Sequence, residues 1–138
     1  MTKIGLIGCG MWGRNLARNL AQLDVLAAVA DRYDENAAEF AAQFNSQKRD
    51  IDTILADPSI DGVAIATSAL SHDHLAIAAL QAGKHIYVEK PMSLTLCGAT
   101  SIANAAEKAG RLVMVGHLIR YHAAYCELQA QVSAGAIG

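Results

Sequence analysis

The feature that most constrains this chain is a glycine-rich turn between an apolar run and a helical pattern near the N-terminus. Residues 3–7 form an apolar, strand-like run that leads directly into the G-C-G-M-W-G turn of residues 8–13, and residues 14–20 continue with helical spacing. In a G-x-G-x-x-G turn the first glycine makes a tight bend, the second lets the backbone approach a pyrophosphate, and the third allows close helix–strand packing. The pattern predicts a dinucleotide-binding turn, with phosphates at the helix N-terminus.

An acid at the end of the next apolar run supports this interpretation. The glycine pattern alone is weak, because tight strand-to-helix turns also use glycine where no ligand binds. Residues 25–30 end in Asp31, about 20 residues beyond the turn, where a Rossmann domain places a carboxylate for the adenosine ribose hydroxyls. Asp31 favours NAD, because it repels a 2′-phosphate. The adjacent Arg32 leaves NADP open, because a guanidinium can pair with that phosphate.

Composition sets the broad class. The chain has 138 residues, of which 53% are hydrophobic and 17% charged, with a net charge of −2, which fits one globular domain with an adequate core. The near-neutral charge and scarce aromatics argue against nucleic acid as the main partner. No apolar run reaches the length of a membrane span, and the N-terminus enters a strand without a leader-like apolar region. We therefore expect a cytoplasmic protein with no membrane partner.

The three cysteines show no C-x-x-C spacing and are odd in number, so they predict neither a disulfide framework nor a zinc site. We expect Cys9, Cys97 and Cys126 to be small buried hydrophobic residues. Cys9 has an alternative, because partial exposure near a helix N-terminus would lower its pKa and make it reactive. His72 and His74 do not predict a metal site, since positions i and i+2 point to different faces of a helix.

Strand-like runs alternate with helical patterns along the chain, which predicts an α/β fold. We expect a doubly wound, parallel, six-stranded Rossmann sheet with helices on both faces. The expected strands are residues 3–7, 25–30, 46–48, 63–66, 85–88 and 112–116. The expected helices are residues 14–20, 34–44, 74–82, 95–109 and 121–134, with a short helix and a turn within 45–61. Asp34 and Thr95 are placed to cap their helices.

Several motifs resemble, in order and spacing, the N-terminal domain of the glucose-fructose oxidoreductase / inositol dehydrogenase / MocA family. They are the glycine turn, Asp31-Arg32, residues 65–67 (I-A-T) followed by His72, residues 82–91 (A-G-K-H-I-Y-V-E-K-P) and residues 115–121 (V-G-H-L-I-R-Y). The A-G-K-H-x-x-x-E-K-P segment is the most specific of them. The resemblance covers almost the whole chain. It implies an NAD(P)-dependent oxidoreductase that transfers hydride between nicotinamide and a hydroxyl or carbonyl of a sugar, cyclitol or related molecule.

The resemblance also implies a set of site residues. It makes Lys90 the catalytic candidate, with a hydrogen bond to the substrate hydroxyl or carbonyl; the alternative is a solvated lysine beside Glu89. The implied cofactor contacts are Gly8, Gly10, Met11, Trp12, Gly13, Asp31, Arg32, Thr67, Ser68, Leu70, His72, Glu89, Lys90 and Arg120. His72 has the alternative of simple capping or solvation, and His117 is placed to reach the site.

Two features depart from the family pattern. Cys97 and Gly98 stand where the family has acids in the first turn of a helix, so we expect that helix to start weakly; Ser68 replaces a common proline. Family members continue into a second α/β domain. We therefore expect residues 1–121 to be the dinucleotide-binding Rossmann domain, and residues 122–138 to be a terminal helix and the start of a crossover to a substrate domain that is absent here.

These expectations leave alternatives for function. Half a cleft holds a substrate poorly, so we expect little activity from the chain alone. The partners expected are a dinucleotide, a small polyhydroxylated substrate in a two-domain parent and, through an exposed apolar surface, a second copy of the chain. The alternative function is a non-enzymatic module that senses dinucleotide or docks a partner. A methyltransferase is less favoured, because it would not predict Glu89-Lys90-Pro91 at the end of a strand.

Overall fold

A parallel sheet forms the middle layer of the computed structural model, which describes residues 1–137. Its strands are β1 (Ile4–Ile7), β2 (Leu26–Ala30), β3 (Gln47–Lys48), β4 (Gly62–Ile65), β5 (His85–Val88) and β6 (Val113–Val115). Within residues 1–137 they form one six-stranded sheet in the order β3-β2-β1-β4-β5-β6, and every neighbouring pair is parallel. This is the doubly wound order of the Rossmann fold, which confirms the predicted fold class.

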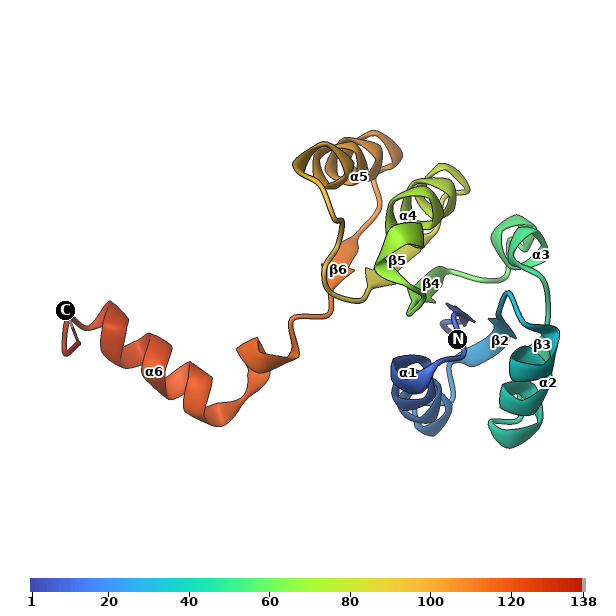
Figure 1. Cartoon of the computed structure of the whole chain (residues 1–138), viewed down its shortest axis with the longest axis horizontal. Helices are drawn as coiled ribbons and strands as arrows, with labels where there is room; N and C mark the ends of the chain where they lie inside the picture. The colour runs from blue at the N-terminus through green and yellow to red at the C-terminus, as the bar shows by residue number, and fades with distance from the viewer. Residues whose placement is uncertain (138) are drawn as a thin grey trace.

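Helices cover both faces of this sheet (Figure 1). One face carries α1 (Met11–Gln22) and α2 (Asp34–Gln43); the other carries α3 (Ile51–Ala56), α4 (His72–Gln81) and α5 (Leu96–Ala109). The short 3₁₀ segment η1 (Ala69–Ser71) leads into α4. After β6 the chain continues through η2 (Leu118–Tyr121) into α6 (Ala123–Ser133).

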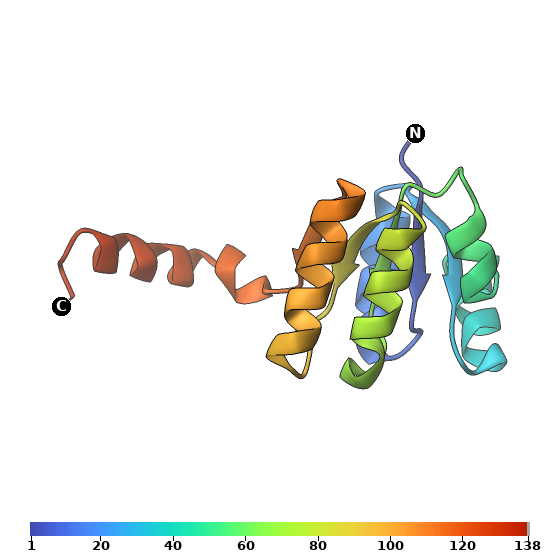
Figure 2. The same ribbon diagram turned by 90° about the horizontal axis from the view of Figure 1, so that it is seen from above.

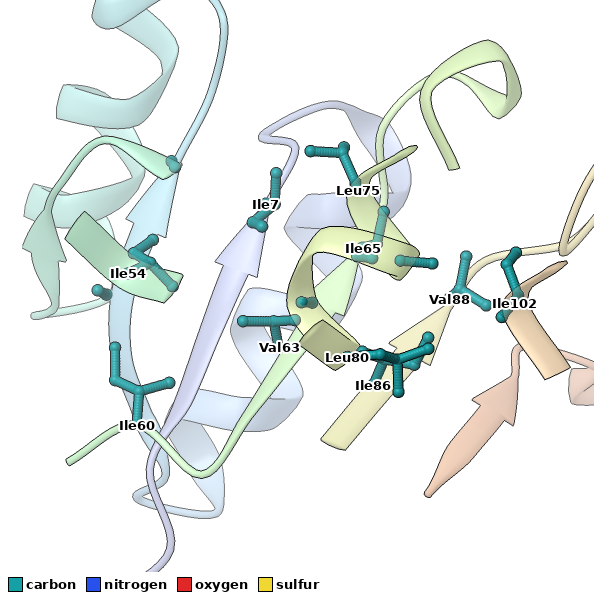
Figure 3. Close-up of a cluster of buried hydrophobic side chains, with 14 residues drawn as sticks. Ile7, Ile54, Ile60, Val63, Ile65, Leu75, Leu80, Ile86, Val88 and Ile102 are labelled. Atoms are coloured by element: carbon teal, nitrogen blue, oxygen red, sulfur yellow. The ribbon is translucent and has the colours of Figure 1, made fainter. Parts of the chain in front are cut away.

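Alternate residues of β1, β2, β4 and β5 enter two hydrophobic cores. In β1, Ile7 enters the core under α3, α4 and α5, whereas Leu6 enters the core under α1 and α2. Figure 3 shows the first core, in which Ile54 of α3, Leu80 of α4 and Ile102 of α5 converge on the strands. Each fully buried side chain of this size contributes about 1.5–3 kcal/mol. Burial on both faces explains why the strands read as continuous apolar runs.

The helix starts differ from the predictions at two places. α1 begins at Met11 rather than residue 14, because Gly10 already has the extended backbone of an N-cap. The N-cap of α2 is Tyr33, not Asp34. Asp34 instead lies in the first turn, where its negative charge interacts favourably with the positive end of the helix dipole. Its carboxylate also forms an ion pair with Lys48 Nζ at 2.7 Å. The predicted cap at Asp34 is therefore wrong by one position.

The start of α5 corrects the expectation of a weak helix. Thr95 caps it as predicted, since its Oγ1 accepts a hydrogen bond of 3.0 Å from the Gly98 amide. The missing acid comes from α4: a Cβ at Gly98 would overlap Asp73 Oδ2, so this carboxylate lies against the first turn of α5. Ser93 Oγ donates to the same oxygen at 3.1 Å. Tertiary packing thus supplies the negative charge that the sequence of α5 lacks.

The last elements form an arm that extends away from the sheet beyond β6 (Figures 1 and 2). α6 packs chiefly against η2, and no residue of α6 is buried within the described part of the chain. The predicted continuous helix over residues 121–134 is wrong, because His122 has an extended backbone that separates η2 from α6. His122 Nδ1 accepts from the Ala124 amide at 3.3 Å and caps α6. None of the helices in residues 1–137 has the length and apolar character to cross a membrane.

Candidate dinucleotide site

The strand register aligns five loop starts in one row at the carboxyl edge of the sheet. The last residues of five strands are register partners: Ala30, Ile7, Ile65, Val88 and Val115. The residues that follow them are Asp31, Gly8, Ala66, Glu89 and Gly116. Backbone hydrogen bonds continue the sheet into this row: the Gly8 N–H donates to Ala30 O (2.8 Å), and the Gly116 N–H donates to Val88 O (2.9 Å). Doubly wound folds bind ligands at this edge, beside the β1/β4 switch point.

Two glycines of the turn are required by the fold itself. Gly8 has a φ of +105°, and a Cβ there would lie 2.6 Å from the carbonyl carbon of Ala66. A Cβ at Gly13 would overlap the carbonyl oxygen of Gly8. Gly8 therefore permits the bend beside β4, and Gly13 permits the close approach of α1 to the turn, as the motif predicts.

Gly10 is different, because nothing in the protein requires a glycine there. Its φ of −83° suits any residue, and a Cβ would meet no heavy atom within 4 Å among residues 1–137. Across the same residues, no side chain caps the N-terminus of α1 and its first turn contains no acid. The first amides of this helix and its positive end are therefore available to an anion. This open cradle fits a pyrophosphate.

Asp31 is fixed beside this cradle. Its Oδ2 accepts a hydrogen bond from the Cys9 amide at 2.7 Å, and its Oδ1 accepts one from the Tyr33 amide at 2.9 Å. The guanidinium of Arg32 lies over the Tyr33 ring, 5.1 Å from its centroid. Two backbone amides thus hold the carboxylate at the end of β2, and the arginine that follows it turns onto the neighbouring aromatic ring.

A pocket of about 460 Å³ opens next to Asp31. Six predicted site residues line it: Gly8, Gly10, Asp31, Arg32, Thr67 and Ser68. Sequence reasoning missed four further polar or aromatic lining residues: Tyr33, Asn36, Ser71 and His74. Of these four, Tyr33 could have been predicted from the sequence, because it directly follows Asp31-Arg32. The pocket joins the β2 end, the glycine turn and the loop after β4, which suits the adenosine half of a dinucleotide.

A second pocket of about 640 Å³ lies on the other side of the turn, toward the arm. It brings together the predicted residues Trp12, Lys90 and Arg120 with His117. Gly116 and Tyr125 also line it, and Leu118 and Ile119 add an apolar wall. Tyr125 was missed because its place depends on the direction in which the arm leaves β6, which helical spacing does not report.

Lys90 reaches this second pocket from the end of β5, where it is exposed. The peptide bond to Pro91 is cis. The preceding Glu89 is buried, and its carboxylate accepts hydrogen bonds from the Tyr87 hydroxyl at 2.8 Å and from the Lys90 amide at 3.3 Å. Lys90 therefore lines the pocket, while the acid before it is buried and does not line it.

Five predicted cofactor contacts do not line either pocket: Met11, Gly13, Leu70, His72 and Glu89. His72 is buried; its Nδ1 lies 2.8 Å from Pro91 O and its Nε2 lies 3.2 Å from Thr67 O. It connects the loop after β4 to the segment after Lys90, so the solvated alternative is wrong. Leu70 on η1 and Met11 at the start of α1 are 81% and 85% exposed. Direct contact of these five residues with a cofactor stays a prediction.

The cysteines separate into two kinds. Cys9 is buried, and burial together with the Asp31 carboxylate raises the pKa of its thiol to about 12. The alternative of a reactive Cys9 thiol is therefore wrong, because the neutral form dominates near neutral pH. Cys97 and Cys126 are exposed, against the expectation that they are buried, because the first turn of α5 and the arm leave them uncovered. No cluster of three potential metal ligands occurs within residues 1–137.

An open glycine turn at a helix N-terminus, an acid held at the end of β2 and pockets on both sides of the turn define a dinucleotide-binding Rossmann domain. The chain belongs to the Gfo/Idh/MocA oxidoreductase family with an NAD-binding Rossmann fold, whose family model matches residues 2–117.

Known relatives agree with this assignment. Inositol 2-dehydrogenase of Acidothermus cellulolyticus is 36% identical over 143 residues, covering 99% of this chain and 42% of that protein. UDP-N-acetylglucosamine 3-dehydrogenase of Acidithiobacillus ferrooxidans is 35% identical over 123 residues, covering 88% of this chain and 39% of that protein. The crystal structure of an NAD-binding protein from Listeria innocua matches with a TM-score of 0.88 at 30% identity, covering 99% of this chain and 41% of that one. The chain thus spans about two fifths of the length of these relatives.

Proposed function

We propose that this chain binds NAD along the carboxyl edge of its sheet and forms the cofactor-binding half of an oxidoreductase. The reaction is hydride transfer between nicotinamide and a hydroxyl or carbonyl carbon of a sugar, cyclitol or related polyhydroxylated molecule. The observation that supports the cofactor is Gly10, at the uncapped start of α1, where no contact within residues 1–137 requires a glycine. The family supports the reaction class, since the inositol dehydrogenase and the UDP-N-acetylglucosamine dehydrogenase named above match 99% and 88% of this chain.

The two pockets suggest how the cofactor lies. The pyrophosphate would accept hydrogen bonds from the first amides of α1 beside Gly10. The adenosine would then occupy the pocket of Asp31, and the nicotinamide would enter the pocket of Lys90. Gly10 lines the first pocket and Trp12 the second, so one dinucleotide across the turn reaches both.

NAD is the expected cofactor rather than NADP. Reorienting Asp31 away from a 2′-phosphate would break its hydrogen bonds to the Cys9 and Tyr33 amides. A 2′-phosphate beside this fixed carboxylate is repelled, whereas a 2′-hydroxyl can donate to it. Arg32, the group that would pair with a phosphate, lies on the Tyr33 ring instead.

Lys90 is the proposed catalytic residue. A bound nicotinamide would supply the hydride acceptor or donor; the chain supplies an ammonium that donates a hydrogen bond to the substrate oxygen and stabilises the negative charge that develops there. His117 shares the pocket and is the nearby imidazole that could move the proton of that oxygen. Trp12 and Ile119 add apolar surface to the lining of the same pocket.

A titration with NADH and with NADPH tests the cofactor assignment. Trp12 is the only tryptophan of the chain and lines the Lys90 pocket, so its fluorescence reports binding there. We expect NADH to change the fluorescence at lower concentration than NADPH. The absence of any response to either nucleotide at millimolar concentration, confirmed by calorimetry, would contradict the proposal as a whole; tighter binding of NADPH would contradict only the preference for NAD.

A further inference from the structure

Glu89 is a buried acid next to Gly116, which lines the Lys90 pocket. It is 5% exposed, and its two oxygens accept hydrogen bonds from the Tyr87 hydroxyl and the Lys90 amide. Within residues 1–137 no Lys, Arg or His side chain forms an ion pair with it. A buried carboxylate without a cationic partner is costly, so its position beside a pocket-lining residue points to a role at the pocket.

Gly116 connects this carboxylate to the pocket. Gly116 lines the pocket, and a Cβ there would lie 2.9 Å from Glu89 Oε2 and 2.5 Å from Tyr87 Oη. The Glu89 oxygen therefore lies directly behind a residue that has no side chain. Across so thin a layer of protein, the field of the carboxylate reaches the pocket with little screening by water.

Tyr87 keeps the carboxylate in this place. Its ring packs against the core under α1 and α2, and its hydroxyl donates to Glu89 Oε1 at 2.8 Å. Burial and the hydrogen bond to Glu89 raise the pKa of Tyr87, so the phenol remains a protonated donor. The acid is thus held by a rigid aromatic side chain on one side and by the Lys90 amide on the other.

We propose that Glu89, held by Tyr87 behind Gly116, makes this site favour the oxidised, positively charged nicotinamide over the neutral reduced ring. The inference rests on the proposed function, because it requires the nicotinamide to lie in the Lys90 pocket. Lys90, Arg120 and His117 also face this pocket, and the two permanent cations among them disfavour a positively charged ring. Glu89, behind Gly116, is the negative charge that offsets them. Glu89 is then a specificity residue for the redox state of the cofactor, and Tyr87 is a positioning residue.

The test compares the Kd of NAD⁺ with that of NADH by calorimetry, with ADP-ribose as a ligand that lacks nicotinamide. In Glu89→Gln we expect NAD⁺ to bind about three- to tenfold more weakly, the effect of one partly screened charge at this range, with NADH and ADP-ribose within about twofold. Tyr87→Phe keeps the Glu89 carboxylate but removes the hydrogen bond that positions it. The loss of NAD⁺ affinity in this variant should therefore be smaller than in Glu89→Gln and in the same direction. Tyr121→Phe, at a tyrosine that is 73% exposed, is the matched control and should change none of the three.

The outcomes separate the two proposals. Failure of the wild-type chain to bind any of the three ligands would overturn the proposed function. Normal binding with an NAD⁺/NADH ratio that is unchanged in Glu89→Gln would overturn the role of Glu89 alone. An equal loss of affinity for all three ligands in both variants would show that Glu89 and Tyr87 only support the fold. This result would also overturn the proposed role of Glu89. If Glu89→Gln does not fold, the NAD⁺/NADH ratio of Kd values in Tyr87→Phe is the test: an unchanged ratio would overturn the role of Glu89.

Discussion

The carboxylate of Asp31 accepts a 2.7 Å hydrogen bond from the backbone amide of Cys9, which joins the end of β2 to the glycine turn after β1. The group expected to recognise the ribose is therefore built into the loop expected to hold the pyrophosphate. A change at Asp31 should alter the selection of the cofactor and the shape of the turn together.

We predict that Asp31→Asn weakens NADH binding by about tenfold and brings the affinities of NADH and NADPH closer together. Loss of the charge removes the repulsion of a 2′-phosphate, and the amide group cannot accept from both backbone amides as the carboxylate does. Fluorescence titration with both nucleotides measures the ratio. Asp24→Asn is the control, because Asp24 is exposed after α1 and its positive φ of 57° suits asparagine. An unchanged ratio in Asp31→Asn would remove Asp31 from the site.

The first and second glycines of the turn should respond in opposite ways to substitution. Gly10→Val should fold normally, because its Cβ enters open space, yet lose dinucleotide binding by more than tenfold. Gly8→Ala should lower the free energy of unfolding by about 2 kcal/mol or more, because it combines a positive φ with a backbone clash. Thermal unfolding and NADH titration of both variants check this contrast. A Gly10→Val variant that still binds NADH tightly would contradict the pyrophosphate assignment.

The raised pKa of Cys9 makes a prediction about pH. A thiol whose pKa is near 9.0 when unfolded and about 12 when folded stabilises the fold fully below pH 9, and this contribution is lost as the pH rises toward 12. The pKa of Tyr87 is also raised, so this residue too lowers the stability of the fold at high pH. The contribution of Cys9 is therefore measured as the difference in stability between wild type and Cys9→Ala. Urea unfolding should show a smaller loss of stability above pH 9 in Cys9→Ala. At pH 8 iodoacetamide should modify Cys97 and Cys126 well before Cys9.

The contact between α4 and the start of α5 predicts a cost at Gly98. Gly98→Ala should lower the free energy of unfolding by about 1–3 kcal/mol, because the new methyl group would displace the Asp73 carboxylate. Cys97→Ala, at the exposed neighbouring position, should change it little. In the double variant with Asp73→Ala the loss should be less than the sum of the single losses, since both act on one contact. Additive losses would show that Asp73 does not support α5.

Local features of the fold and site were readable from the sequence. The strand, glycine turn and helix are contiguous, so residue types and spacing predict them together. Asp31 follows because it immediately succeeds a strand, whereas the role of Lys90, two residues beyond β5, rests on the resemblance of Glu89-Lys90-Pro91 to the family segment. The contribution of Asp73 to α5 was not readable, since it joins residues 25 positions apart through the packing of two helices. The same holds for Glu89 and Gly116, which become neighbours only through the β5–β6 register. The break at His122 was missed because the apolar spacing of the arm continues through it.

Lys90 distinguishes an oxidoreductase domain from a module that only senses dinucleotide. If Lys90 acts on the substrate oxygen, Lys90→Met should abolish the turnover of polyols, sugars or nucleotide sugars that the chain shows, while NADH affinity stays within about threefold. Lys108→Met, at the exposed C-terminal end of α5, is the control for loss of an ammonium. Turnover is measured by the change in nicotinamide absorbance in long incubations, because we expect a low rate from this chain. Tight NADH binding without turnover of any of these substrates would favour the sensing module, and turnover that survives in Lys90→Met would place the catalytic group elsewhere.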